Sequence, residues 1–429
     1  MWPAVRAGGL ARAQNWAVDI ADGPGSEQTA TGGEPRRRWR RWLIGAVVAA
    51  LLLVAAFYLG GGYYFSGLIY DELFEVSASG EPETHEVMAV AAQEDGTGSV
   101  TLRMGPDAAT RADTTALTGL AWSDSYAQAG VATEVDGDLV TRPYTMVLGV
   151  PPRVGDEVEL DGWFFPEDPE LGLGLPFQNV TYESELATFP AWYVPGTEGE
   201  TTWAVFVHGR GAEPRESLRS MQIVAEHGLP MLAITYRNDE GQARSPEHRY
   251  GYGANESDDL TGAVAYAVDQ GATKIVLFGF SMGGAIVLDF LYDDPLATYV
   301  AGAVLDAPAS NAGRIVDERA EERTLPVVGL PIPESLESVA LWITELRYDV
   351  SFAEINYVRR VEELPLPILV LQGTGDRTIP EVVNAEFAEA DPEQISYETF
   401  EGAEHVRAWN AERVRYGALV NDYLADLSL

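Results

Sequence analysis

A serine flanked by glycines is the residue of this sequence best suited to act as a nucleophile. Ser281 lies in Gly279-Phe280-Ser281-Met282-Gly283, directly after the apolar run 274–280 and directly before the apolar run 282–290. A strand, a tight turn and a helix in succession form the setting in which a G-x-S-x-G sequence exposes its hydroxyl. With 43 glycines in the chain the pattern alone could be a glycine-rich turn with an idle serine, but this context favours a nucleophile.

A serine hydroxyl needs a general base within hydrogen-bond reach, and the base needs an acid to orient it. His405 follows the strand expected at 395–402 and precedes the last expected helix, and Asp376 follows the strand expected at 367–373. The order Ser281, Asp376, His405 is the order in which a serine, its acid and its base follow one another on a strand-turn-helix scaffold. Asp306, in the segment AVLDAP, is the alternative acid.

The negative oxygen of a tetrahedral intermediate needs backbone N–H donors around it. We expect one donor from Met282, the residue after the serine. We expect the other from Arg210, in the loop FVHGRGAEP after an apolar strand, and its guanidinium is available for an additional role. His208, in the same loop, is expected to be a structural hydrogen-bonding residue rather than a base.

Strands and helices alternate from about residue 177 to the C-terminus. The strands are near-continuous apolar runs, which is typical of a parallel sheet covered on both faces. A stretch of helical character at about 307–362 is predicted to form a cap over the site, and its apolar side chains are expected mainly to pack between helices, with an acyl pocket as the alternative. The expected strands are 179–186, 191–196, 202–209, 231–237, 274–280, 301–308, 367–373 and 395–402, the expected helices are 215–228, 256–270 and 282–292, and the cap residues are Leu341, Trp342, Ile343, Phe352 and Tyr357.

The N-terminal part predicts a membrane anchor. Residues 42–65 contain no charge and, as a helix, are long enough to cross a hydrocarbon core of about 30 Å. Residues 1–41 are predicted to be a disordered cytoplasmic tail with a basic end, because arginines precede the apolar run and acidic residues follow it. The rest of the chain is therefore expected on the extracytoplasmic side, and a cleaved signal peptide is the competing interpretation. Residues 74–175 alternate in short runs and predict a small β-rich region.

Composition excludes several classes of function. The net charge is −38, with 66 acidic against 28 basic residues, and such a surface repels nucleic acid. Cysteine is absent, so the chain has neither a thiol nucleophile nor a thiolate metal site. We therefore expect a small-molecule, acyl or peptide substrate and a lipid bilayer as partners, and no indication of an oligomeric state emerges.

The segments FVHG, GFSMGG, LQGTGDRTIP and GAEH together resemble the α/β-hydrolase superfamily, in particular its membrane-anchored esterase and peptidase-like branches. The resemblance covers residues 177–429 and implies a doubly wound, mostly parallel α/β sheet with a helical cap. It also implies a serine hydrolase that cleaves ester, thioester or amide bonds through an acyl-enzyme, with neither metal nor organic cofactor. A serine peptidase and a non-catalytic, membrane-tethered binding module are the alternatives. The charged Arg210 and the β-rich region depart from the family's pattern.

Overall fold

The computed structural model describes residues 34–76, 83–105, 112–326, 328–364 and 366–427. The predicted tail therefore lies mostly outside the described residues. The helical elements are α1 Glu34–Ile69, η1 Tyr70–Phe74, η3 Ala112–Thr115, α2 Pro169–Leu173, η4 Pro214–Ser217, α3 Leu218–Ala225, α4 Ser257–Asp269, α5 Met282–Asp293, η5 Pro295–Tyr299, α6 Ala312–Glu321, α7 Glu334–Tyr348, η6 Tyr357–Glu363, α8 Glu381–Ala390, α9 Ala408–Ala411 and α10 Arg413–Asp426. The strands are β1 Thr84–Ala92, β2 Thr97–Arg103, β3 Thr118–Trp122, β4 Ser125–Ala129, β5 Glu134–Asp136, β6 Leu139–Leu148, β7 Glu157–Asp161, β8 Gln178–Glu183, β9 Thr188–Val194, β10 Thr202–Val207, β11 Met231–Ile234, β12 Lys274–Phe280, β13 Val300–Asp306, β14 Ile368–Gly373 and β15 Ile395–Phe400.

An eight-stranded sheet organises the C-terminal part, from β8 onward. Its order is β15-β14-β13-β12-β10-β11-β9-β8. The six strands from β15 to β11 run parallel, whereas β9 pairs antiparallel with β11 and β8 pairs antiparallel with β9. The mostly parallel sheet predicted from the sequence is confirmed, and we call this part the C-terminal domain.

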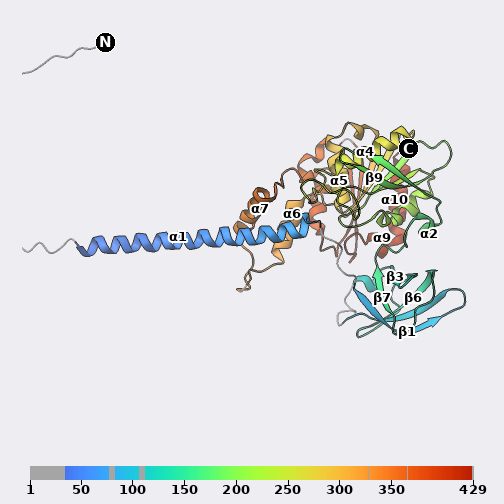
Figure 1. Ribbon diagram of the computed structural model, residues 1–429, viewed down its shortest axis with the longest axis horizontal. Coiled ribbons are helices and arrows are strands. Elements are labelled where there is room, and N and C mark those ends of the chain that lie inside the picture. The colour runs from blue at the N-terminus through green and yellow to red at the C-terminus, as the bar shows by residue number, and fades with distance from the viewer. Residues whose placement is uncertain (1–33, 77–82, 106–111, 327, 365, 428–429) are drawn as a thin grey trace, which may run out of the picture. The chain divides into compact units, whose positions relative to one another are not determined.

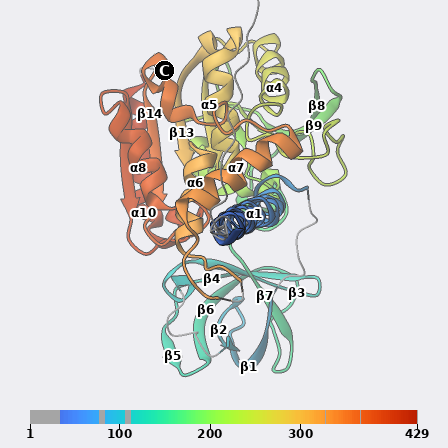
Figure 2. The ribbon, with the colours of Figure 1, turned by 90° about the vertical axis from the view of Figure 1, so that its left-hand side faces the viewer.

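Alternate residues of each central strand enter two separate cores. In β12, Ile275 and Leu277 pack with α4, α5 and α8, whereas Val276 and Phe278 pack with α3 and α10. Side chains alternate between the two faces of a strand, so a strand that is apolar throughout needs cover on both faces. The sheet is therefore the middle of three layers, and the helices on its two faces hold it in place (Figure 2).

The predicted small β-rich region is, more specifically, a closed antiparallel barrel (Figure 1). The order β2-β1-β7-β3-β4-β6 closes because β2 also pairs with β6, and β5 adds to β6 outside the ring. Its interior holds aliphatic residues such as Val87, Val100 and Leu120, each with no exposed surface. Local alternation predicts strands but not which distant strands pair, so the closure of the barrel was not predictable from the pattern alone.

Three hydrogen bonds join the barrel's chain to the C-terminal domain at Asn410. Its side-chain amide donates to the carbonyl oxygens of Leu117 and Gly162, both at 2.9 Å. Its backbone carbonyl accepts from the N–H of Leu117, also at 2.9 Å. Asn410 is fully buried, so these bonds lie in the interior, where an unpaired polar group would be costly.

The first helix extends beyond the predicted apolar span in both directions. Helix α1 begins at Glu34, eight residues before Trp42, and continues as the short π-helix η1 to Phe74. Arginine is a good helix former, so the basic cluster does not end the helix. Within the described residues, this is the one helix long and apolar enough to cross a membrane.

Helices α6, α7 and η6 occupy the segment predicted as a cap. Four of the five cap residues named from the sequence pack between helices as expected, since Ile343, Phe352 and Tyr357 are buried and Leu341 is partly buried against the same core. Trp342 does not, because 56% of it is exposed on α7.

Candidate active site

Ser281 sits in a strained turn between β12 and α5. Its φ and ψ are 53° and −119°, a conformation that non-glycine residues rarely adopt. The backbone is held there by the Ser281 N–H, which donates to the Asp306 carbonyl at 2.9 Å. Gly283 must be a glycine, because a Cβ at this position would lie 2.1 Å from the carbonyl oxygen of Val207. Strain of this kind, kept by the surrounding bonds, is typical of functional sites.

The structure brings Ser281, His405 and Asp376 together. The Nε2 atom of His405 lies 2.8 Å from Oγ of Ser281, and its Nδ1 atom lies 2.7 Å from Oδ2 of Asp376. The Asp376 side chain is fully buried, and its Oδ1 accepts the backbone N–H groups of Thr378 and Ile379, both at 2.8 Å. Those N–H groups fix the carboxylate, which in turn orients the imidazole toward the serine.

Asp306, the alternative acid, makes no hydrogen bond to His405. It is the last residue of β13, next to β12 in the sheet, and it is 3% exposed. Its Oδ1 has no hydrogen-bond partner within the described residues. Burial raises the pKa of Asp306 to about 7, with Arg219 opposing that shift. The geometry therefore favours Asp376 over Asp306 as the acid.

The loop that follows β10 passes directly against the serine. A Cβ built on Gly209 would lie 3.1 Å from Cβ of Ser281. The Gly209 N–H is already used, since it donates to Oε2 of Glu216 at 2.8 Å. The N–H groups of Arg210 and Met282, by contrast, have no hydrogen-bond partner among the residues that the structure describes. Met282 opens α5, so the helix dipole adds positive potential at this point.

His208 lies in the same loop but faces away from the serine. Its Nε2 lies 2.9 Å from Oδ2 of Asp239, its Nδ1 lies 2.9 Å from the carbonyl of Gly209, and its ring stacks on Tyr236. Burial alone would lower the pKa of His208, but Asp239, the Gly209 carbonyl and Glu216 together outweigh it, and the pKa is raised. His208 therefore holds the loop through hydrogen bonds, which is the structural role predicted for it.

A buried polar network that was not predicted from the sequence connects this loop to the loop that carries His405, which we call the histidine loop. Glu216, which holds the Gly209 N–H, lies 3.9 Å from the guanidinium of Arg219. Arg219 donates to the carbonyl of Val406 at 2.6 Å and to Oδ1 of Asn410 at 2.8 Å. Val406 follows His405 and has a φ of 52°, so the bond from Arg219 supports a strained position. These residues are scattered in sequence, and no local motif indicates them.

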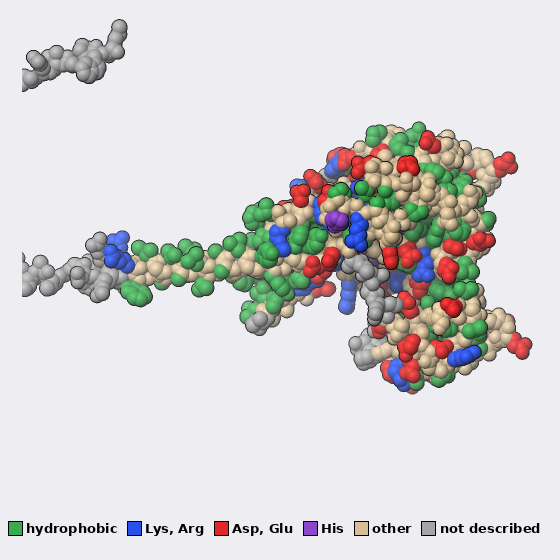
Figure 3. All heavy atoms as spheres, in the orientation of Figure 1, with side chains coloured by type: hydrophobic (Ala, Val, Ile, Leu, Met, Phe, Trp, Pro, Cys, Tyr) green, Lys and Arg blue, Asp and Glu red, His purple; other side chains and the backbone are tan. Residues whose placement is uncertain are grey.

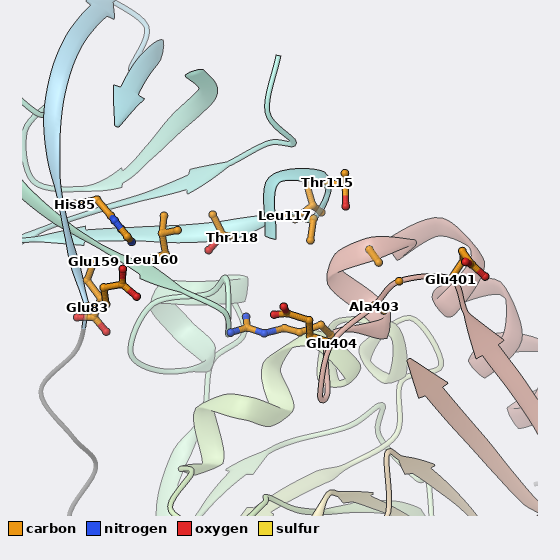
Figure 4. A pocket seen from close by; sticks show the side chains of 14 residues that line it. Glu83, His85, Thr115, Leu117, Thr118, Glu159, Leu160, Glu401, Ala403 and Glu404 are labelled. Atoms are coloured by element: carbon orange, nitrogen blue, oxygen red, sulfur yellow. The ribbon is translucent and has the colours of Figure 1, made fainter. Parts of the chain in front are cut away.

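The cavity above the serine is small. It has a volume of about 110 Å3, and its walls include Ile315 and Arg319 of α6 as well as Arg210 and Tyr252. A larger cavity of about 300 Å3 lies where the barrel meets the histidine loop, and Figure 4 shows Glu83, Glu159 and Glu404 around it. The triad does not line this second cavity. Among the described residues no cluster of His, Cys, Asp and Glu has a geometry suited to a metal ion.

Residues 204–415 match the sequence model of the alpha/beta hydrolase family. No curated protein sequence matches the chain. Solved structures similar to it include the esterase Pf2001 of Pyrococcus furiosus, with 18% identity, a TM-score of 0.47, and coverage of 65% of this chain and 99% of that one. Another is the esterase RhEst1 of Rhodococcus sp. ECU1013, with 19% identity, a TM-score of 0.40, and coverage of 58% and 99%. The esterase EaEST of Exiguobacterium antarcticum shares 16% identity, with a TM-score of 0.41 and coverage of 58% and 100%.

The matched segment begins in β10 and ends in α10, and it contains the serine turn, the aspartate loop and the histidine loop. Residues 204–415 therefore belong to the α/β-hydrolase superfamily.

Proposed function

We propose that this chain is a membrane-anchored serine hydrolase that cleaves carboxylic ester, thioester or amide bonds. Ser281 is the nucleophile, His405 the general base and acid, and Asp376 the residue that orients the histidine. The observation that carries this proposal is the pair of contacts on the imidazole, 2.8 Å to the Ser281 Oγ and 2.7 Å to the Asp376 carboxylate.

In the first half of the reaction, Oγ of Ser281 attacks the carbonyl carbon and His405 takes its proton. The negative oxygen of the tetrahedral intermediate accepts hydrogen bonds from the N–H groups of Met282 and Arg210. These two donors have no other hydrogen-bond partner among the described residues. His405 then gives its proton to the leaving alcohol, thiol or amine, and the acyl group remains as an ester on Ser281. Asp376 stabilises the imidazolium that forms on the way.

In the second half, water replaces the leaving group. His405 takes a proton from the water, the hydroxide attacks the acyl-enzyme, and the collapse of the second intermediate returns the proton to Oγ. A carboxylic acid leaves, and Ser281 is restored. Mutually oriented base and acid groups of this kind contribute several orders of magnitude in rate.

The size of the cavity above Ser281 favours small substrates. Its volume of about 110 Å3 is below the roughly 300–1,000 Å3 of pockets that enclose drug-sized ligands. We therefore propose short acyl groups as the preferred class. With p-nitrophenyl esters of increasing chain length, kcat/KM should be highest at two to four carbons. A maximum of kcat/KM at eight carbons or more would contradict the preference for short acyl groups, but it would leave the assignment of the triad unchanged.

The anchoring and orientation belong to the same proposal. Helix α1 supports a membrane span, and arginines before it with acidic residues after it favour a cytoplasmic N-terminus. The C-terminal domain then lies on the extracytoplasmic side. A protease added to intact cells should digest that domain, and protection of the domain would reverse the orientation.

The catalytic assignment is tested with an activity probe. Wild-type protein should react with a fluorophosphonate and hydrolyse p-nitrophenyl butyrate, and Ser281→Ala should do neither. Ser396→Ala removes an exposed serine of β15 and serves as the matched control. A folded wild-type protein that is unreactive would favour the non-catalytic binding module, and turnover of aminoacyl amides in preference to esters would favour the peptidase.

A further inference from the structure

One stripe of α7 is docked on the end of α1. A Cβ built on Gly61 would lie 3.1 Å from Leu336, and a Cβ on Gly62 would lie 2.7 Å from Val339. Arg347 completes the contact, because it donates to the carbonyl of Tyr63 at 3.0 Å and its guanidinium lies 3.8 Å from the Tyr63 ring centre. The glycines of α1 thus let the two helices approach closely along residues 336–347 of α7.

The neighbouring stripe of α7 is exposed and carries no charge. It consists of Ser335, Ser338, Trp342 and Leu346, at the spacing of one helix face. Trp342 is 56% exposed and Leu346 is 71% exposed. An uncharged stripe that ends in two large apolar side chains is unusual on a chain with a net charge of −38.

A turn between α6 and α7 exposes two more apolar side chains. Val328 and Leu330 are each 61% exposed, and the turn is closed by the N–H of Leu325, which donates to the carbonyl of Leu330 at 2.7 Å. Figures 1 and 2 show α7 and this turn on opposite sides of the last turns of α1. Hydrophobic side chains gather at this end of the domain in Figure 3. We call Val328, Leu330, Trp342 and Leu346 the apolar rim.

A contact near the start of α7 shows which part of α1 lies at the same level as the rim. The hydroxyl of Ser335 lies 2.8 Å from that of Tyr58, and Tyr58 belongs to the charge-free run 42–65. From Tyr58 to the end of that run, α1 rises about 10 Å. If the run crosses a membrane, the first turns of α7 lie beside its last part. Residues at that level are at the boundary between hydrocarbon and headgroups.

We propose that the apolar rim is a bilayer-contacting surface, inserted into the headgroup and outer acyl region on both sides of the anchor. This inference rests on the membrane anchoring in the proposed function. Lipid is the occupant that the arrangement favours, because residues 57–65, the last part of the charge-free run, belong to the same compact unit as both halves of the rim. A bilayer around these residues would reach Trp342 and Leu346 on one side and Val328 and Leu330 on the other. Amphipathic elements with aromatic and aliphatic faces insert about 5–10 Å in this way.

The rim also places the active site close to the bilayer. Arg319 and Val316 of α6 line an apolar cleft against Phe65 and Leu73 at the end of α1 and η1. Arg319 lines the cavity above Ser281 as well. One helix therefore separates the membrane-proximal cleft from the catalytic cavity.

Because the chain has no cysteine, a single introduced cysteine can be labelled without background. Leu346→Cys and Leu330→Cys report on the two halves of the rim. Tyr64→Cys reports on the anchor, and Val414→Cys on α10, where Val414 is 87% exposed, is the control for an exposed apolar position. Each single-cysteine variant of the full chain is labelled with one NBD fluorophore and is reconstituted into vesicles of phosphatidylcholine and phosphatidylglycerol. Quenching by spin-labelled lipids is then measured.

We expect the fluorophores at positions 346 and 330 to be quenched nearly as strongly as the one at position 64. Their quenching should be about threefold stronger than that at position 414, as for side chains inserted at the interface. If 64 is quenched and 346 and 330 are quenched no more than 414, the chain is anchored but the rim does not contact lipid, and the inference is wrong. That outcome is also expected if a second copy or another protein covers the rim. If 64 is not quenched, the anchoring fails and this inference fails with it. Fluorophosphonate labelling of the same samples reports on the triad independently.

Discussion

The pH dependence of stability should carry a large contribution from Asp306. This carboxyl lies at the end of β13, is 3% exposed, and has an Oδ1 without a hydrogen-bond partner among the described residues. Burial raises its pKa from 3.8 to about 7, against the opposing charge of Arg219. Asp306→Asn keeps the size of the side chain and cannot ionise, so it removes this contribution alone.

The stability of the fold should fall as the pH rises, because the pKa of Asp306 is raised in the folded state. A carboxyl whose pKa is raised in the folded state stabilises the fold fully below its unfolded pKa and loses that contribution as the pH rises through the folded value. The rise of the pKa from 3.8 to about 7 corresponds to about 4 kcal/mol of stability in total, and about 3 kcal/mol of it is lost between pH 5 and pH 8.5. For a domain of this size that is a difference in Tm of about 6–12 °C.

Thermal unfolding of the full chain in detergent micelles, followed by circular dichroism at pH 5 and pH 8.5, measures this difference. The Tm of the wild type should fall with pH by about 6–12 °C more than that of Asp306→Asn. Asp422→Asn, at an exposed position of α10, should follow the wild type. If the wild type and Asp306→Asn show parallel pH dependences, the pKa of Asp306 does not differ between the folded and unfolded states and the prediction is wrong.

Three further changes test other parts of the account. Asp376→Asn should lower kcat for p-nitrophenyl butyrate about 10³–10⁴-fold, with KM little changed, because the histidine loses its orienting charge; a tenfold loss or less would contradict that role. Gly283→Ala should unfold or inactivate the protein, since its Cβ would lie 2.1 Å from the Val207 carbonyl, and an active, stable variant would refute the close approach. Burial and the neighbouring Asp317 raise the pKa of Glu337 to about 8, so stability is lost as the pH rises toward and through that value; Glu337→Gln should raise Tm at pH 9 more than at pH 5, and an equal effect at both would be evidence against the shift.

The parts of the site that the sequence predicts are those with local signatures. The serine turn has a strand before it and a helix after it, and the acid and base follow later strands of the same sheet. Because the carboxyl ends of parallel strands share one edge, residues that follow β12, β14 and β15 must lie near one another. The order of Ser281, Asp376 and His405 was therefore enough to predict that they meet.

The support behind the triad was not predictable in the same way. Glu216, Arg219 and Asn410 lie in segments with no shared motif, and they meet only because α3 and α9 pack on the same side of the sheet. Closure of the barrel depends in the same way on the pairing of β2 with β6, between strands that lie far apart in the chain. The exposed position of Trp342 depends on which stripe of α7 meets α1, and hydrophobicity alone does not distinguish the two stripes.

In the proposed reaction Ser281 becomes covalently acylated, with His405 as its base. Mass spectrometry of the fluorophosphonate adduct can locate the modified residue by fragmenting the tryptic peptide 275–314, which contains both Ser281 and Ser310. The adduct should be found on Ser281 in the wild type and should be lost or greatly slowed in His405→Ala. An adduct on Ser310 or elsewhere would show that Ser281 is not the nucleophile, and an undiminished adduct in His405→Ala would show that His405 is not its base.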